Sequence, residues 1–328
     1  MENGRFLDTV TAWEGTFWGN GPQAAISKDC HKKRNANGLN LESQPLESQL
    51  GESALPPNVP KGLLLAGEST PHPRLRLHKG FPSHYLADKH DIIVYVPPGY
   101  DSHPSMTYPV LYMQDGQNLF DGRTSFIPGR TWQMREHADA AIEAGEVEPL
   151  VIVGIYNAGD RRIDEYTHER DWQMGGGKAD QYGLTLTQEI LPWIAAHYRV
   201  KTEREQTGLG GSSLGGLVSL YLGLRYASIF GKLALLSPSV WWNNKSILGY
   251  LNERAPEIWD RPRVWLDVGD KEGKRTVHDT EMLNRRLKAN RWKPGETLHF
   301  EKAHGGTHDE ASWSHRVRPM LRFLFPAG

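Results

Sequence analysis

Nine residues, 208–216, constrain the fold more than any other part of the chain: they read Gly-Leu-Gly-Gly-Ser-Ser-Leu-Gly-Gly. Within them, Gly211, Ser213 and Gly215 form the pattern G-x-S-x-G, which is typical of a serine on a sharp turn between a strand and a helix. Such a turn holds the hydroxyl clear of the backbone. Side chains two residues before and after the serine would collide there, which explains the two glycines. Ser213 is therefore a candidate nucleophile.

The flanking residues support a strand before this turn and a helix after it. Residues 207–210 complete a short, buried strand pattern. Apolar residues after the serine recur at intervals of three and four, as on one helix face: Leu214, Leu217, Val218, Tyr221 and Leu222. The alternative is a glycine-rich helix entrance without chemistry.

The same segment also begins a G-x-G-x-x-G pattern at Gly208 and Gly210, which in a strand-to-helix setting is typical of dinucleotide binding. Its third glycine position is Ser213, however, and the next strand-like run, 232–237, ends without the acidic residue that would bind a ribose. We therefore reject a nucleotide-binding function.

The charge balance excludes several partner classes. The 328 residues include 38 basic and 39 acidic ones, a net charge of -1, so no bulk field favours nucleic acid or an anionic membrane. The single cysteine, Cys30, excludes an intramolecular disulfide. No apolar run reaches the roughly 18 residues of a membrane helix, and no secretory pattern begins the chain. We expect a cytoplasmic protein without membrane insertion.

The chain divides near residue 60. Residues 30–60 lack sustained periodicity, and Pro56, Pro57 and Pro60 close the stretch as a linker would. A basic cluster at 31–34 is better explained as a solvated loop than as a localisation signal. We predict a partly flexible N-terminal extension over 1–60 and one catalytic domain over 61–328.

The second part alternates strand and helix patterns. Strands are predicted at 91–96, 108–113, 150–155, 232–237, 263–268 and 298–301, and helices at 182–197, 214–226, 277–290 and 309–324. Because several strands are apolar at consecutive positions, we predict an α/β fold: a mostly parallel central sheet with helices on both faces.

A serine on such a turn requires an acid and then a histidine later in the chain. Asp270 and Glu272 follow the strand at 263–268, and His304 and His308 follow the strand at 298–301. His308 lies where the last helix begins and is the favoured general base, while His304 is explained as a loop-ordering residue. The Gly-Gly pair between the two histidines argues against a shared metal site, so we expect no metal.

Six segments together resemble one known family. They are 94–100, 108–121, 211–216, 237–242, 267–273 and 308–313, and they follow the family's order over about 83–325. The chain resembles the esterase family of α/β-hydrolases, which includes enterochelin, feruloyl and acetylxylan esterases and, more distantly, mycolyltransferases. The resemblance implies the α/β-hydrolase fold and an esterase without a cofactor.

The resemblance also assigns the acid and one oxyanion donor. It maps the acid onto Glu272, with Asp270 as the alternative and a serine–histidine pair without an acid as a third possibility. The donor loop maps onto Asp115, Gly116 and Gln117, where a simple tight turn is the alternative. We predict an oxyanion hole formed by the backbone N–H groups of Leu214, which follows the nucleophile, and Gln117.

Large aromatic residues lie near the predicted active-site loops. An aromatic cleft would suit a hydroxycinnamoyl or catechol acyl group, although any single tryptophan is better explained by core packing. Arg162 follows the strand at 150–155 and either binds an anionic or phenolic substrate or forms an ion pair that holds the loop. The candidate substrate-binding residues are Trp241, Trp242, Arg162 and Trp313, with Trp132 and Trp172 nearby.

The sequence thus predicts a serine carboxylic-ester hydrolase in which Ser213 attacks, His308 transfers the proton and Glu272 orients His308. Its substrate would be a small-molecule or glycan-linked ester with an aromatic (feruloyl or catecholate) or acetyl group. The alternatives are an acyltransferase with the same residues and a catalytically silent, hydrolase-like binding protein. The pattern leaves the formation of a homo-oligomer open.

Overall fold

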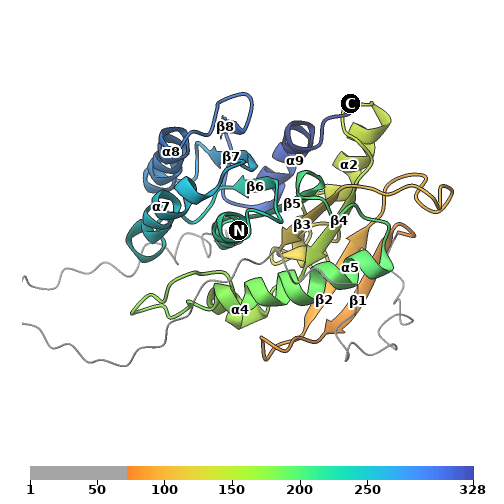
Figure 1. Cartoon of the computed structure of the whole chain (residues 1–328), viewed down its shortest axis with the longest axis horizontal. Coiled ribbons are helices and arrows are strands. Elements are labelled where there is room, and N and C mark those ends of the chain that lie inside the picture. The colour runs from red at the N-terminus through yellow and green to blue at the C-terminus, as the bar shows by residue number, and fades with distance from the viewer. Residues whose placement is uncertain (1–71) are drawn as a thin grey trace, which may run out of the picture. The chain divides into compact units, whose positions relative to one another are not determined.

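Eight strands form one sheet through the part of the chain that the computed structural model describes, residues 72–328 (Figure 1). Their order across the sheet is β1-β2-β4-β3-β5-β6-β7-β8, in which β2 runs antiparallel to both of its neighbours and the strands from β4 to β8 are parallel. The strands are β1 (Leu75–Phe81), β2 (His90–Tyr95), β3 (Val110–Gln114), β4 (Val151–Ile155), β5 (Thr207–Ser212), β6 (Lys232–Leu236), β7 (Arg263–Gly269) and β8 (Leu298–Ala303). This topology is the α/β-hydrolase fold that we predicted.

Helices cover both faces of the sheet (Figure 1). One face is covered by α2 (Met134–Glu143) and α9 (Glu310–Leu324), which pack against each other. The other face is covered by α4 (Ala179–Leu184), α5 (Leu191–His197), α6 (Leu214–Arg225), α7 (Trp242–Arg254) and α8 (Lys274–Ala289). Short helical segments lie in the connections: η3 (Gly116–Asn118), η4 (Gly159–Arg161), α3 (Arg162–Glu165), η5 (Thr185–Ile190), η6 (Arg204–Gln206) and η7 (Ala255–Glu257).

The two-sided cover explains why the central strands read as continuous apolar runs. In β3, Val110 and Tyr112 are buried on the α6 side, while Leu111 and Met113 are buried on the α9 side. Successive side chains of a strand point to opposite faces, so a strand between two helical layers needs apolar residues at every position. The central strands could therefore be predicted from their continuous apolar runs.

Three main elements were not predicted: β1, α2 and α7. The edge strand β1 is half-exposed along most of its length and lacks a continuous apolar run. The helix α2 was also not predicted, although it buries Met134, Ala138 and Ala141 at helical spacing, because two of these three residues are small. The helix predicted at 182–197 is present, but a π-helical segment, η5, separates α4 from α5.

The parallel strands bring the loops that follow them to one edge of the sheet, where ligands bind in open α/β folds. The candidate site residues follow β3 (Gln117), β5 (Ser213), β7 (Glu272) and β8 (His308). Within residues 72–328, no helix is long and apolar enough to cross a membrane. The predicted extension 1–60, and its boundary, lie outside the described residues and stay a prediction.

Candidate active site

Ser213 occupies a strained turn between β5 and α6. Its φ of 55° and ψ of -123° lie outside the regions that a serine ordinarily adopts. Two backbone hydrogen bonds tie the turn to the end of β6: the Ser213 N–H donates to the Leu236 carbonyl at 3.1 Å, and the Ser239 N–H donates to the Ser213 carbonyl at 3.0 Å. Strain of this kind persists only where surrounding contacts enforce it, and it concentrates at functional sites.

The two flanking glycines are required by close packing. A Cβ atom on Gly211 would lie 2.8 Å from Cβ of Gln114, and one on Gly215 would lie 3.0 Å from the same atom. A Cβ on Gly215 would also lie 3.1 Å from Oδ2 of Asp115. The loop after β3 therefore lies directly against the turn that carries Ser213.

The structure places Glu272 against His308. Nδ1 of His308 lies 2.7 Å from Oε2 of Glu272, whose side chain is fully buried, whereas the His308 side chain is 31% exposed. The helix α9 begins at Glu310, two residues after His308, and its N-cap, Asp309, accepts hydrogen bonds from the N–H groups of Ala311 and Ser312. The histidine is thus held between a buried carboxylate and a capped helix, with one edge open to solvent.

The alternative residues, Asp270 and His304, form a separate pair. Nδ1 of His304 lies 3.0 Å from Oδ2 of Asp270, and the Gly305 N–H donates to Oδ1 of the same carboxylate at 2.9 Å. The His304 side chain is 96% exposed. Because the two histidines turn to different carboxylates, the geometry gives His304 the loop-ordering position that we expected for it.

Buried donors hold the second oxygen of Glu272. Oε1 accepts hydrogen bonds from the Ser237 hydroxyl at 2.6 Å and from the Gly269 N–H at 2.7 Å, which leaves Oε2 for His308. Burial by itself raises the pKa of Glu272, but the hydrogen bond from His308 and those from Ser237 and Gly269 outweigh it. The pKa of Glu272 therefore lies below its ordinary value, and the carboxylate stays charged at neutral pH.

The hydroxyl of Ser213 bonds to Ser239 in this structure, with the two Oγ atoms 3.2 Å apart. Within residues 72–328, Ser213 and His308 are not hydrogen-bonded to each other. In enzymes without bound substrate, catalytic hydrogen bonds are often long or unformed and tighten when substrate binds.

The loop after β3 offers open backbone donors. Asp115 has a φ of 56° and begins the 3-10 turn η3, in which a Cβ on Gly116 would lie 2.4 Å from the Gly154 carbonyl carbon of β4. Within residues 72–328, the N–H groups of Gln117 and Leu214 have no hydrogen-bond acceptor. These are the two groups predicted to receive the oxyanion.

Arg162 braces this loop. Its Nε and Nη2 atoms donate to the two carboxylate oxygens of Asp115, each at 2.7 Å. Asn157 adds a third hydrogen bond to Asp115, from Nδ2 to Oδ1 at 2.7 Å. Of the two roles considered for Arg162, the geometry provides an ion pair, and this pair joins the segment after β4 to the loop after β3. The side chain remains 25% exposed.

Most of the candidate tryptophans lie in the core. Trp242 and Trp132 are at most 1% exposed, and Trp313 is 5% exposed with its ring in a T-shaped contact with that of His308. The indole N–H groups of Trp242 and Trp313 donate to the Glu169 carbonyl and the Ser237 hydroxyl. This burial argues against direct substrate contact by Trp242 and Trp313. Trp241 is partly exposed, and Trp172 is 86% exposed.

Three residues at the site carried no sequence signal of their role. Ser237 was noted only as part of a family segment, yet its hydroxyl contacts Glu272 from 35 residues away. Glu310 is buried in the first turn of α9, where Oε1 accepts a hydrogen bond from Nδ2 of Asn118 at 3.2 Å. Asn118 and Glu310 are 192 residues apart, and no local pattern reports such a contact.

A family model described as "Putative esterase" matches residues 83–324, which is most of the chain. The chain belongs to this esterase family, and it is an ester hydrolase with the α/β-hydrolase fold.

Three curated relatives illustrate the family. "Uncharacterized protein YbbA" of Bacillus subtilis is 29% identical over 205 residues, covering 60% of this chain and 74% of that protein. An endo-1,4-beta-xylanase/feruloyl esterase of Xylanibacter ruminicola is 26% identical, covering 71% of this chain and 29% of its own length. An iron(III) enterobactin esterase of Dickeya dadantii is 25% identical, covering 60% of this chain and 46% of its own length.

Solved structures share the fold. BES protein from Bacillus cereus superposes with a TM-score of 0.64 at 24% identity, covering 79% of this chain and 97% of that one. An IroE-like serine hydrolase from Shewanella oneidensis gives a TM-score of 0.63 at 20% identity, covering 76% of this chain and 80% of the other.

Proposed function

We propose that this ester hydrolase is a serine esterase that works through an acyl-enzyme and cleaves esters whose acyl part carries an aromatic ring. The observation that carries the proposal is the hydrogen bond between His308 and a fully buried Glu272, on loops at the same sheet edge as the strained turn of Ser213. A nucleophile, a base and an orienting carboxylate in this chain order are typical of α/β-hydrolases.

In the first half-reaction, Oγ of Ser213 forms a bond to the ester carbonyl carbon, and its proton passes to Nε2 of His308. Glu272 holds the opposite nitrogen, Nδ1, and so keeps Nε2 unprotonated and ready to accept. The Ser213 hydroxyl must first leave Ser239, which requires only a rotation of its side chain.

The tetrahedral intermediate carries a negative charge on the former carbonyl oxygen. The N–H groups of Leu214 and Gln117 are the donors proposed for this charge, since both are open and their loops lie against each other. The intermediate collapses when the carbon–oxygen bond to the alcohol breaks and His308 returns the proton to that alcohol. Water then attacks the acyl-enzyme by the same route, which releases the acid and restores Ser213.

The choice of an aromatic acyl group draws support from two sources. Relatives include an iron(III) enterobactin esterase and a feruloyl esterase. Trp241, two residues after the Ser239 that contacts the nucleophile, is only partly buried, so its indole is available to an aromatic ring. Arg162 remains 25% exposed beside the loop after β3.

The test compares methyl ferulate, a cyclic catecholate siderophore, acetylated xylan and p-nitrophenyl acetate with purified enzyme. We expect kcat/KM for at least one aromatic ester to exceed that for acetylated xylan, and Ser213→Ala to abolish every activity while Ser212→Ala retains most of it. A triad serine typically accounts for a factor on the order of 10⁶ in turnover. Activity in Ser213→Ala would overturn the serine mechanism, and cleavage of acetylated xylan alone would overturn the aromatic class.

A further inference from the structure

A buried cluster with two carboxylates and one guanidinium lies beneath the His308–Glu272 pair. Asp267 on β7 and Arg316 on α9 are 0% and 2% exposed. Nη1 of Arg316 donates to Oδ1 of Asp267 at 2.6 Å, and its Nη2 lies 3.4 Å from Oε1 of Glu272. One buried cation therefore touches two buried carboxylates, only one of which faces the histidine.

Ser237 joins the three charges. Its hydroxyl donates to Glu272 at 2.6 Å and accepts from Nη1 of Arg316 and from the indole N–H of Trp313, each at 3.1 Å. The residue is fully buried with a φ of 44°, which a serine rarely adopts. Strain at a fully buried polar residue indicates that its position matters to the site around it.

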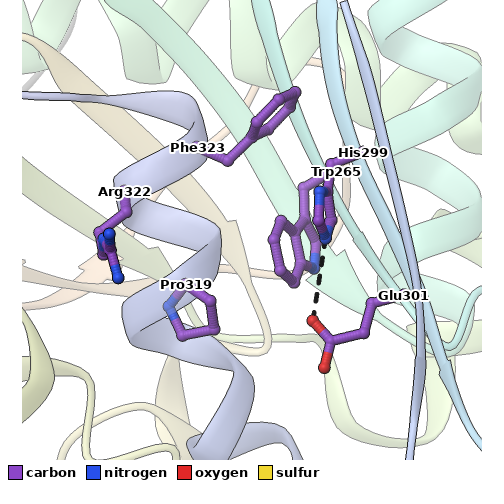
Figure 2. Close-up of a pocket in the computed structure, with 6 residues that line it drawn as sticks. All are labelled: Trp265, His299, Glu301, Pro319, Arg322 and Phe323. Carbon is purple, nitrogen blue, oxygen red and sulfur yellow. Dashed lines mark ion pairs between the residues drawn. The ribbon is translucent and has the colours of Figure 1, made fainter. Parts of the chain in front are cut away.

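Asp267 is itself fixed from the far side. Its Oδ2 accepts a hydrogen bond from Nε1 of Trp265 at 2.7 Å. The ring of His299 stacks on Trp265 with centroids 4.3 Å apart, which holds the indole in place (Figure 2). Trp265 also lines a cavity of about 300 Å³ between β8 and α9, with the residues shown in Figure 2: His299, Glu301, Pro319, Arg322 and Phe323.

The charge balance of this cluster explains its composition. Arg316 helps to hold Glu272, but its positive charge in a buried site would oppose a second positive charge on His308. Asp267 cancels that charge, so that the charge of Glu272 remains for the imidazolium. With His308 neutral the cluster has a net charge of one negative unit, and when His308 accepts the proton from the nucleophile the net charge becomes zero.

We propose that Asp267 is a positioning residue for the reaction: by neutralising Arg316 it lets Arg316 anchor Glu272 without weakening His308 as a base. The inference rests on the proposed serine mechanism. Burial raises the pKa of Asp267 to about 6, although Arg316 and Trp265 act against this, so Asp267 is charged above about pH 6, and below that pH the wild type should converge on the behaviour of Asp267→Asn.

The test is the pH dependence of kcat/KM with p-nitrophenyl acetate, whose acid limb reports protonation of the free base. In Asp267→Asn, Arg316 keeps its charge and disfavours the imidazolium. We expect the acid limb to move down by about one pH unit and kcat to fall by about tenfold, since one pKa unit corresponds to a factor of ten, with KM little changed.

Arg316→Gln leaves two carboxylates near His308, so the acid limb should move up. The double variant Asp267→Asn/Arg316→Gln removes both charges, and its acid limb should return toward the wild-type position. A merely structural ion pair would not produce opposite shifts that cancel. If Asp267→Asn fails to fold, Arg316→Gln and the double variant still give the upward shift and its reversal.

Other charges near His308 need a control. They are Asp309, which pairs with Arg130 at 3.4 Å, and Glu310 in the first turn of α9. The profiles are therefore repeated with Glu310→Gln as the parent, where the same shifts should appear. Asp139→Asn is the matched control, because Asp139 accepts two bonds from Arg74 at 2.7 and 2.6 Å but lies on α2. It should leave the acid limb in place.

An unchanged acid limb in folded Asp267→Asn and in folded Arg316→Gln would overturn this inference while leaving the serine mechanism intact. Activity in Ser213→Ala would overturn the mechanism itself. The two failures are thus separate.

Discussion

His308 contacts Glu272 and not Asp270, because two backbone hydrogen bonds fix the loop after β7 relative to the loop after β8. The Asp270 N–H donates to the Ala303 carbonyl at 3.0 Å and the Lys271 N–H donates to the Gly306 carbonyl at 2.9 Å. This pairing directs Asp270 toward His304 and leaves Glu272, further along the loop, under His308.

The first prediction separates the two acids. Glu272→Gln should keep the fold but lower kcat for p-nitrophenyl acetate by up to about 10⁴, by analogy with other triads in which the imidazole takes the wrong tautomer. Asp270→Asn and His304→Ala should retain most of the activity, because their pair is exposed and contacts neither Ser213 nor His308. Near-normal activity in Glu272→Gln would favour a serine–histidine pair, and greater loss in Asp270→Asn would give that residue the role.

Motifs identified the candidate reactive residues because such residues recur in short local patterns. Gly211, Ser213 and Gly215 form such a pattern, and the loops after predicted strands contained Glu272 and His308. The support of these residues could not be predicted in the same way. Ser237 and Arg316 are 79 residues apart, and only the folded sheet and α9 bring them to one carboxylate.

The strands and helices likewise include some that the sequence predicts and some that it does not. Strands between two helical layers were predictable because every position is apolar, whereas β1 lies at the edge and is half-exposed. The helix α7 was not predicted, and Asn243, Asn244 and Lys245 interrupt its first turn with positive φ, which asparagine adopts more readily than most residues. Tertiary contacts override local preference at such places.

The second prediction concerns Arg162. If its role is to brace the proposed oxyanion loop through Asp115, Arg162→Gln should lower kcat with little change in KM; loss of one oxyanion donor costs about 10²–10³ in comparable enzymes. If Arg162 instead binds substrate, KM for an aromatic ester should rise while kcat for p-nitrophenyl acetate stays constant. Arg161→Gln is the control, because Arg161 is 56% exposed and pairs with Asp88 at 3.3 Å.

The third prediction concerns the N-terminal extension. Residues 30–60 lack the periodic apolar pattern that would offset an ordering cost of roughly 1–2 kcal/mol per residue. A protein that begins near residue 60 should therefore stay soluble and hydrolyse p-nitrophenyl acetate with nearly unchanged kcat. Aggregation would show that the removed part belongs to the core, and a loss confined to bulky aromatic esters would assign it to the binding site.

The last prediction concerns Glu310, which is 4% exposed and has one oxygen, Oε2, without a hydrogen-bond partner among the described residues. Burial raises its pKa, and the charges of Asp309 and Asp115 add to this, against smaller opposing effects of a backbone hydrogen bond and His308. The folded state therefore binds this proton more tightly than the unfolded state does. The stability from Glu310 is complete below the ordinary carboxyl pKa and is lost as the pH rises through the raised one.

Glu310→Gln cannot ionise, so its melting temperature should exceed that of the wild type at pH 8, and the difference should shrink or reverse at pH 5. Glu281→Gln is the control: Lys302, at 2.8 Å, lowers the pKa of Glu281, so the small stability from this exposed pair is nearly complete at both pH values and its loss should differ little between them. Calorimetry at the two pH values decides the question. Equal destabilisation of Glu310→Gln at pH 5 and pH 8 would contradict the prediction. It would mean that Glu310 is ionised in the folded protein and that its hydrogen bond with Asn118 requires the charged carboxylate.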